Sequence, residues 1–315
     1  MANKSKFAAA HFHDEEAARA WFEAARWPEG PICPHCNYGK FYATKKPGRY
    51  RCAEADCRKD YTVQTKSVME RSHAPLTHWA VAFHMAASSK KGFSAHQLHR
   101  ELGCQYNTAW FLHHRVMEAM RRGGLETPMG SGGGIVEADE TYFGQVAERS
   151  PSPQRRGRPY TKGGKSGPSG KRAVIALVER TDAGSNVRAF HVATADGETV
   201  ADIVRENIAR EAILMTDESR LYTKVGQEFA GHETVNHSHK EYVRGRVHTN
   251  TVENYFLTFK RGMRGVYQHC AEKNLHRYLA EFEFRYNTRN ITDGDRAVLA
   301  VQGGRGKRLT YRQPH

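Results

Sequence analysis

Four cysteines near the N-terminus constrain the fold more than any other feature of the sequence. They form the pairs Cys-Pro-His-Cys (33–36) and Cys-Ala-Glu-Ala-Asp-Cys (52–57), with fifteen residues between the pairs. Two close pairs of thiolates supply the four soft ligands of a tetrahedral Zn²⁺ site. Because protein would fill every ligand position, the spacing predicts one structural zinc rather than a catalytic one. The predicted ligands, within a zinc ribbon at 31–66, are Cys33, Cys36, Cys52 and Cys57.

The composition indicates a polyanionic partner. The 315 residues include 48 Lys and Arg against 34 Asp and Glu, a net charge of +14. Nucleic acid is the first such partner, and an anionic membrane surface is the second. No apolar run approaches the length that spans a bilayer, so we expect no membrane association. Without a secretory signal, and with clustered cysteines that fit a reducing compartment, the chain is expected in the cytoplasm, associated with the nucleoid.

The chain divides into segments of different character. Helical periodicity predicts a helix within 14–27 and three helices between 75 and 122, the last two joined by Leu-Gly-Cys. After a Gly-rich stretch, the pattern predicts the order βββαβαβαα. The predicted segments are an N-terminal helix (1–30), the zinc ribbon (31–66), a helix-turn-helix-like region (67–122), a Gly-rich linker (123–134), an α/β domain (135–292) with a basic loop (145–171), and a basic C-terminal tail (293–315).

Polar side chains in two segments are candidates for contacting DNA. The third helix of the helix-turn-helix-like region begins with residues of the type that a recognition helix presents to base edges. The alternative is a plain helical hairpin with a solvated charged face. The DNA-contacting residues predicted here are Gln105, Asn107, Thr108 and Arg115, with Arg155, Arg156 and Arg158 in the basic loop.

Two acidic residues stand where strands would deliver them to a site. Asp139 follows an alternation of apolar residues, and Asp217 follows the apolar run at 212–215. The carboxyl ends of strands are where α/β sheets place their chemistry. Each acid also has a plainer interpretation. Asp217 would cap the next helix, and Asp139 would be one of several solvated acids together with Glu137 and Glu140.

A predicted helix at 250–263 carries a third acid. Its apolar residues form one stripe, and Glu253 and Lys260, seven residues apart, lie within roughly 20° of each other beside that stripe. Asn250 is rotated about 60° further away. The alternative is structural, because Asn250 as N-cap with Glu253 three residues later would form a capping box.

These residues resemble the DDE transposases and retroviral integrases. The layout of Asp139, Asp217 and Glu253, with thirty-five residues between the last two, is similar to theirs, and Lys260 matches their basic helix residue. More specifically, the chain resembles an IS1595-type (ISXO2-like) insertion-sequence transposase from about residue 15 to 290. The matching segments are RWPEGPICPHC, DETYFG, TDES, HTNTVENYFLTFKRGMRGVY and YLAEFEFRYNTR.

The resemblance implies an α/β fold of the RNase H-like class, with a mixed sheet flanked by helices. It also implies a DNA transposase that cleaves 3′ ends and transfers strands by two-metal-ion phosphoryl transfer. Two Mg²⁺ or Mn²⁺ ions about 3.5–4 Å apart neutralise charge at the phosphate in such a reaction. Asp139 would bridge both ions, Asp217 would hold one, and Glu253 or Asn250 the other. Phosphate contacts are expected from Lys260, Arg261 and Arg264.

Partners and alternatives follow from the same reasoning. We expect the chain to bind the terminal inverted repeats of its element and target DNA, as a homo-oligomer that is at least a dimer on DNA. One alternative is a DNA-binding regulator that uses only the zinc ribbon and the helix-turn-helix. It leaves the three acids unexplained. Another is a structure-specific nuclease of the same fold, which cleaves without joining.

Overall fold

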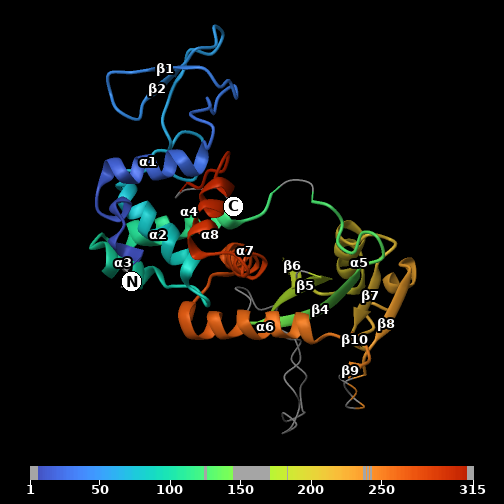
Figure 1. Ribbon diagram of the computed structural model, residues 1–315. Coiled ribbons are helices and arrows are strands. Elements are labelled where there is room, and N and C mark those ends of the chain that lie inside the picture. Colours follow the sequence, from blue (N-terminus) through green and yellow to red (C-terminus); the bar gives the residue numbers. More distant parts are fainter. Residues whose placement is uncertain are drawn as a thin grey trace, which may run out of the picture. The chain divides into compact units, whose positions relative to one another are not determined.

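The chain forms two compact units. The computed structural model describes residues 6–123, 126–144, 171–182, 184–236, 239, 241 and 243–310 (Figure 1). Unit 1 comprises residues 1–122 and 288–315, and unit 2 comprises residues 123–287. The chain passes from unit 1 to unit 2 at the start of the Gly-rich segment, and it returns to unit 1 after residue 287.

Unit 1 is a group of helices that carries a small sheet. Asp14 caps the first helix by accepting a hydrogen bond from the backbone N of Ala17 at 2.7 Å, and Ser94 caps the third. The third helix ends at Gly103, whose φ of 61° is a left-handed conformation that suits glycine. The helices are α1 (Glu15–Arg26), α2 (Leu76–Ser88), α3 (Ala95–Leu102), α4 (Tyr106–Met120) and α8 (Asp293–Gly303), with 3₁₀ turns at Lys6–Ala8 and Ala10–Phe12.

The prediction of a basic tail at 293–315 is wrong for its first part, because Asp293–Gly303 form helix α8. Thr292 caps this helix, and Ala297, Ala300 and Val301 bury one side of it. Helix α8 packs against α1, α2 and α4. The first part of the segment that was expected to be a tail therefore completes the core of unit 1.

The small sheet of unit 1 belongs to the cysteine-rich segment. It consists of β1 (Phe41–Ala43), β2 (Tyr50–Cys52) and β3 (Asp60–Tyr61), all antiparallel and in that order. Trp27 packs edge-on against Tyr50 at 6.1 Å and against Tyr61 at 5.9 Å, so aromatic rings fill the inner side of a segment too short for a larger core.

Unit 2 is built on a five-stranded mixed sheet in the order β6-β5-β4-β7-β8. The strands β4, β5 and β6 are antiparallel neighbours, and β4, β7 and β8 are parallel. The mixed sheet flanked by helices is confirmed. Its elements are β4 (Ile135–Phe143), β5 (Arg172–Thr181), β6 (Gly184–Val192), α5 (Gly197–Asn207), β7 (Ile213–Thr216), β8 (Gly231–Thr234), β9 (Val243–Arg244), β10 (Val247–His248), α6 (Asn250–Gly262) and α7 (Leu275–Asn287), with short helical turns at Val225–Glu228, Met263–Tyr267 and Glu272–Asn274.

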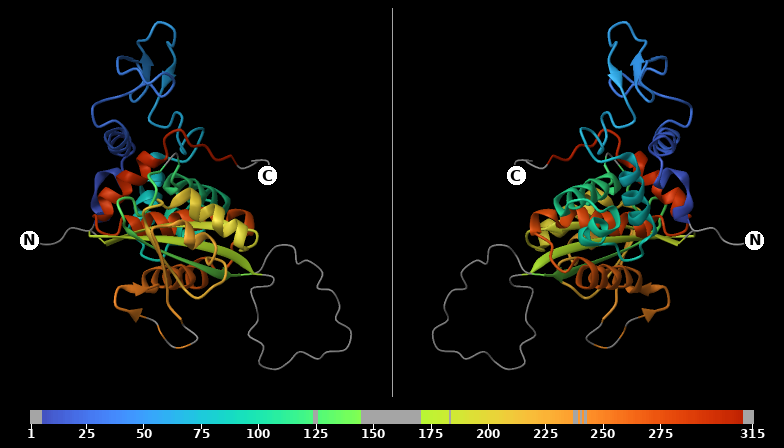
Figure 2. Two further views of the ribbon diagram at one scale, coloured as in Figure 1. Left: turned by 90° about the vertical axis from the view of Figure 1, so that its right-hand side faces the viewer. Right: turned by 90° about the vertical axis from the view of Figure 1, so that its left-hand side faces the viewer.

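The two faces of this sheet are covered by different helices (Figure 2). Val136 and Ala138 of β4 pack with Val200 and Val204 of α5 in one core cluster. Helix α6 covers the opposite face. Helix α7 lies along the edge strand β6, where the Asn287 side chain hydrogen-bonds the backbone N and O of Val187 at 2.7 and 2.9 Å. The edge is thereby closed to pairing with another strand.

Two further expectations differ from the structure. The second helix of the predicted order βββαβαβαα, around residues 221–229, is only a 3₁₀ turn at Val225–Glu228. The Gly-rich linker is partly folded, because Met129 is buried in the core of unit 2 and the backbone N of Gly130 donates to Glu179 Oε1 at 2.6 Å. Residues 145–170 of the predicted basic loop lie outside the described residues.

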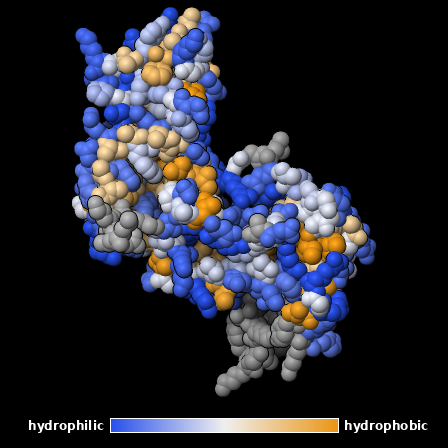
Figure 3. All heavy atoms as spheres, viewed as in Figure 1, coloured by the Kyte–Doolittle hydropathy of each residue, from blue (hydrophilic) through white to orange (hydrophobic). Residues whose placement is uncertain are grey.

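No helix in the described part of the chain is long and apolar enough to cross a membrane. On the face shown in Figure 3, hydrophobic residues are interspersed with hydrophilic ones. The apolar residues of both units instead lie mainly in the cores described above.

Candidate active site and metal centre

The strand register brings Asp139 and Asp217 to neighbouring positions on one face of the sheet. In the parallel pair β4–β7, Glu137 lies opposite Met215. Continuing that register by two residues sets Asp139 beside Asp217, just beyond the carboxyl end of β7. Side chains two residues apart on a strand share a face, so Asp139 lies on the same face as Glu137.

Glu137 attaches helix α6 to this face. Its buried carboxylate accepts hydrogen bonds from the backbone N of Thr251 and of Val252, both at 2.9 Å, and from Thr251 Oγ1 at 2.6 Å. Arg180 Nε of β5 donates a fourth, at 2.6 Å. A carboxylate at this position satisfies the free N–H groups of a helix start and interacts favourably with the helix dipole. The interpretation of Glu137 as a solvated acid is therefore wrong.

The capping box expected at Asn250 is also wrong. Helix α6 begins at Asn250, and its N-cap residue is Thr249, whose side chain makes no cap hydrogen bond. Thr249 Oγ1 instead donates to Glu253 Oε1 at 3.1 Å. Asn250 is exposed at the first helical position. The capping group is Glu137, 114 residues before Thr251 in the sequence.

Asp139 lies within a cluster of negative charge. Burial raises the pKa of Asp139 well above its usual range, and the charges of Glu140, Asp217 and Glu253 raise it further. The β4–β7 register sets Asp139 beside Asp217, and Glu137, two residues before Asp139, holds the first turn of α6, which carries Glu253. Burial, followed by the charge of Asp217, also raises the pKa of Glu140. A group of half-buried carboxylates is the donor set that hard divalent cations prefer.

Lys260 extends this cluster along helix α6. Burial lowers the pKa of the half-buried Lys260, Arg264 lowers it further, and Asp139 acts in the opposite direction. Lys260 follows Glu253 by seven residues, two turns along the same helix. Arg261 is exposed in the last turn of α6, and Arg264 is exposed on the helical turn that follows. The three cations form a positive margin next to the acids.

Asp217 forms a turn of its own. Its Oδ1 accepts a hydrogen bond from the backbone N of Ser219 at 2.9 Å. The next helical turn has Lys224 as its N-cap residue, so Asp217 does not cap it. Thr216, at the end of β7, bonds to His232 Nε2 of β8 at 2.9 Å, which holds the chain just before Asp217 against its neighbouring strand.

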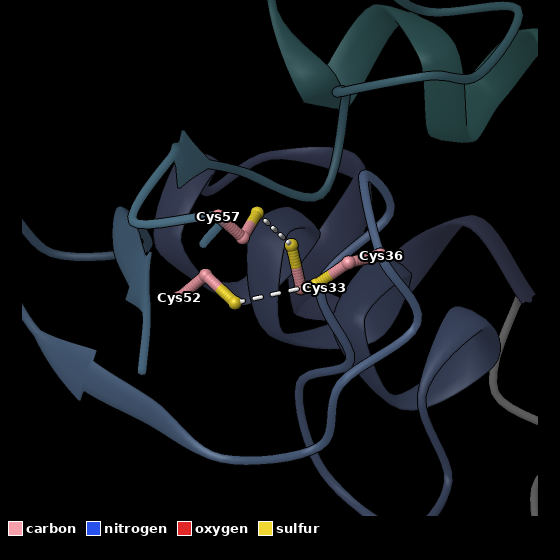
Figure 4. Close-up of side chains that lie close together, drawn as sticks. All are labelled: Cys33, Cys36, Cys52 and Cys57. Carbon is pink, nitrogen blue, oxygen red and sulfur yellow. Dashed lines mark hydrogen bonds between the residues drawn. The ribbon is translucent and has the colours of Figure 1, made fainter. Parts of the chain in front are cut away.

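The four cysteines converge as predicted (Figure 4). All four sulfur atoms lie within 4.8 Å of one another, with Cys33 and Cys57 at 3.8 Å and Cys36 and Cys52 at 3.5 Å. A tetrahedron with Zn–S bonds of about 2.3 Å has S–S edges of about 3.8 Å, so the set fits one structural zinc. Asp139, Asp217 and Glu253 do not form such a compact set among the residues that the structure describes.

The predicted DNA-contacting residues of α3–α4 have different surroundings. Gln105, Asn107 and Thr108 are exposed at the start of α4. Arg115 is buried. Its guanidinium lies over the Phe111 ring at 4.4 Å and donates to the backbone O of Leu309 at 3.2 Å, which contradicts the expected contact with DNA. The predicted residues of the basic loop, Arg155, Arg156 and Arg158, lie outside the described residues.

Comparison with known proteins places these two sites in known domains. Residues 132–287 match the model of the ISXO2-like transposase domain. Residues 13–60 match the model of the transposase zinc-ribbon domain, which confirms the predicted zinc ribbon. The chain is also similar to an uncharacterised protein in the transposable element ISH50 of Halobacterium salinarum. The two are 29% identical over 287 residues, covering 87% of this chain and 91% of the relative.

Proposed function

Because the chain belongs to the ISXO2-like transposase family, we propose that it cleaves DNA at the ends of an insertion sequence and joins the free 3′ ends to target DNA. The single observation that carries this proposal is the strand register that sets Asp139 of β4 beside Asp217, just beyond the end of β7. Glu253 belongs to helix α6, whose first turn is held by Glu137 on the same face of β4 as Asp139.

An RNase H-like arrangement of unit 2 is part of the proposal. It is supported by a sheet in which three antiparallel strands are followed by two parallel ones, in the order β6-β5-β4-β7-β8. The acids then lie on the central strand β4, at the end of the adjacent strand β7, and on the helix that crosses their face.

Divalent cations fit these carboxylates. In our assignment, Asp139, Asp217 and Glu253 would together hold the Mg²⁺ or Mn²⁺ ions. Bound together, the ions would supply charge neutralisation at the phosphate and an activated attacking oxygen. Glu253 is preferred to Asn250 because it affects the pKa of Asp139, whereas Asn250 is exposed.

The chain's other residues orient the DNA. Lys260, half-buried beside Asp139, would contact the phosphate next to the scissile bond, and Arg261 and Arg264 would contact its neighbours. Gln105, Asn107 and Thr108 would read bases of the terminal repeat. We propose that the chain acts on DNA in the cytoplasm as a homo-oligomer, at least a dimer, since an element has two ends to be joined.

The test is Mg²⁺-dependent nicking of an oligonucleotide that carries the element end. Asp217→Ala should lower the rate by at least about a thousandfold, as expected when a group that stabilises transition-state charge is lost. The matched control is Asp202→Ala, the same change on the exposed surface of α5. Undiminished nicking by Asp217→Ala would refute the assignment.

Two further measurements refine the result. Asn250→Ala and Glu253→Ala, assayed side by side, identify the third ligand, and we expect only Glu253→Ala to be inactive. A strand-transfer assay with a pre-nicked end separates a transposase from a nuclease, because a nuclease yields no joined product.

A further inference from the structure

The zinc-ribbon sheet has one packed face and one exposed face. Tyr50 lies opposite Tyr61 in the β2–β3 pair, and both rings contact Trp27 on the packed face. The edge strand β1 is exposed at every position, and Tyr42 at its centre is 54% exposed. Exposed aromatic residues on an edge strand favour unwanted association and usually mark a binding surface.

Cations surround Tyr42 on the exposed face. Tyr42 lies opposite Arg51 on β2, and Arg51 lies opposite Asp60 on β3, so the three side chains share that face. Arg58 lies over the Tyr42 ring at 5.8 Å. We call the set Tyr42, Arg49, Arg51, Arg58 and Asp60 the ribbon face. Three guanidinium groups against one carboxylate leave it with a formal charge of +2.

Asp60 holds two of these cations in fixed positions. It forms ion pairs with Arg49 at 2.9 Å and with Arg51 at 2.7 Å. About half of each arginine side chain remains exposed, 47% for Arg49 and 55% for Arg51. A guanidinium held at one edge keeps donors for a second acceptor, and its planar geometry matches a phosphate. The arrangement is therefore organised before any ligand arrives.

We infer that the ribbon face binds the sugar–phosphate backbone of DNA, with Arg49, Arg51 and Arg58 on phosphates and Tyr42 on the adjoining sugar and phosphate. The inference rests on the proposed function, since it assumes that this chain acts on DNA. Charge complementarity favours a regularly charged polyanion over an apolar partner. Tyrosine hydroxyls and arginines are common phosphate contacts in protein–DNA complexes. Such contacts position a protein without reading sequence, so the ribbon face would add affinity to any DNA.

The salt dependence of binding tests this inference. Full-length, zinc-loaded protein is titrated against a short fluorescein-labelled duplex of arbitrary sequence at several salt concentrations, with fluorescence anisotropy as the readout. The logarithm of the affinity falls linearly with the logarithm of the salt concentration, with a slope of about 0.9 for each phosphate that the protein neutralises. Arg51→Gln should reduce the slope by about one contact. Lys45→Gln, the same charge change on an exposed residue of the β1–β2 turn, should leave it unchanged.

The variant Tyr42→Ala tests the inference without changing the charge of the ribbon face. Its affinity for the duplex should fall about fivefold, the equivalent of one hydrogen bond, with the salt slope unchanged. Because Tyr42 is largely exposed, the zinc content of the variant should equal that of the wild type, which checks that the ribbon is folded.

The outcomes separate this inference from the proposed function. Nicking of the element end by Lys45→Gln, which lies outside the ribbon face, should proceed at the wild-type rate. Equal salt slopes for Arg51→Gln and Lys45→Gln, with nicking by the wild type intact, would overturn the inference about the ribbon face and leave the catalytic assignment standing. If Arg51→Gln changed the sedimentation of the protein but not the salt slope of DNA binding, the ribbon face would bind a second copy of the chain instead. That result would also overturn the inference.

Discussion

Replacing Glu137 with alanine should release the first turn of helix α6 from strand β4. The substitution removes a fully buried carboxylate, and it leaves Arg180 and the backbone N–H groups of Thr251 and Val252 without their acceptor. Breaking a buried ion pair by deleting one partner costs about 3–5 kcal/mol. Because 19% of the Arg180 side chain is exposed and can be rehydrated, we expect the lower end, about 3 kcal/mol, in the free energy of unfolding of unit 2.

Hydrogen–deuterium exchange of peptides from 247–262 measures this loss where it occurs. A change of about 3 kcal/mol corresponds to roughly 150-fold faster exchange at the protected amides. The chain contains its own control, because all four tryptophans, at positions 21, 27, 79 and 110, belong to unit 1. The urea midpoint of tryptophan fluorescence should therefore be the same in Glu137→Ala and the wild type.

Glu137→Gln sharpens the interpretation. Three of the four groups that donate hydrogen bonds to the carboxylate are N–H donors, two on Oε2 and one on Oε1. The amide NH₂ of glutamine must face a donor in either orientation, so this variant should also lose protection, although less than Glu137→Ala. Exchange at the wild-type rate in Glu137→Ala would refute the view that Glu137 holds the helix that carries Glu253.

Three other substitutions have defined outcomes. Asp139→Asn should abolish nicking, yet stabilise the metal-free protein by about 0.5–2 kcal/mol at neutral pH. Burial and neighbouring acids raise the pKa of Asp139 in the folded protein. In the unfolded chain the pKa of an aspartate is about 3.9. The stabilisation of Asp139→Asn relative to the wild type is therefore absent below about pH 4 and grows as the pH rises to the pKa of Asp139 in the folded protein. Urea unfolding of both proteins at several pH values measures it. Cys52→Ser should release the zinc, weaken DNA binding and change the fluorescence of Trp27, which a chelator-dye assay, anisotropy and emission spectra check. Gly226→Ala should destabilise unit 2 by about 1–3 kcal/mol, because a Cβ there would lie 2.1 Å from His232 Nδ1, and urea unfolding of unit 2 measures the loss.

The sequence pattern was sufficient to predict the structure where a residue's environment depends on residues close to it in the chain. The cysteine spacing predicted the zinc ribbon, since each pair of ligands lies on one short turn. The apolar stretches before Asp139 and Asp217 predicted the strands that carry these acids. The stripe along 250–263 predicted the helix that bears Glu253. The catalytic role of the three acids stays a prediction.

The features that were missed depend on residues far apart in the chain. Glu137 has the charge of a surface residue, and only its pairing with Arg180 and with the start of α6 makes its burial favourable. Arg115 likewise reads as a surface cation, but the C-terminal segment at Leu309 covers it. Helix α8 had a local signal, a threonine cap at Thr292 followed by an apolar spacing, hidden by the basic residues on either side.

The return of the chain to unit 1 has a consequence for synthesis on the ribosome. Unit 1 lacks helix α8 until the last part of the chain has been translated, whereas every residue of unit 2 has by then been made. At about 5–20 residues per second, the interval between residues 122 and 303 lasts roughly 10–40 s. During that time α1, α2 and α4 lack the helix that packs against all three. Unit 2 can therefore fold before unit 1, although the helices α1 to α4 of unit 1 precede it in the sequence.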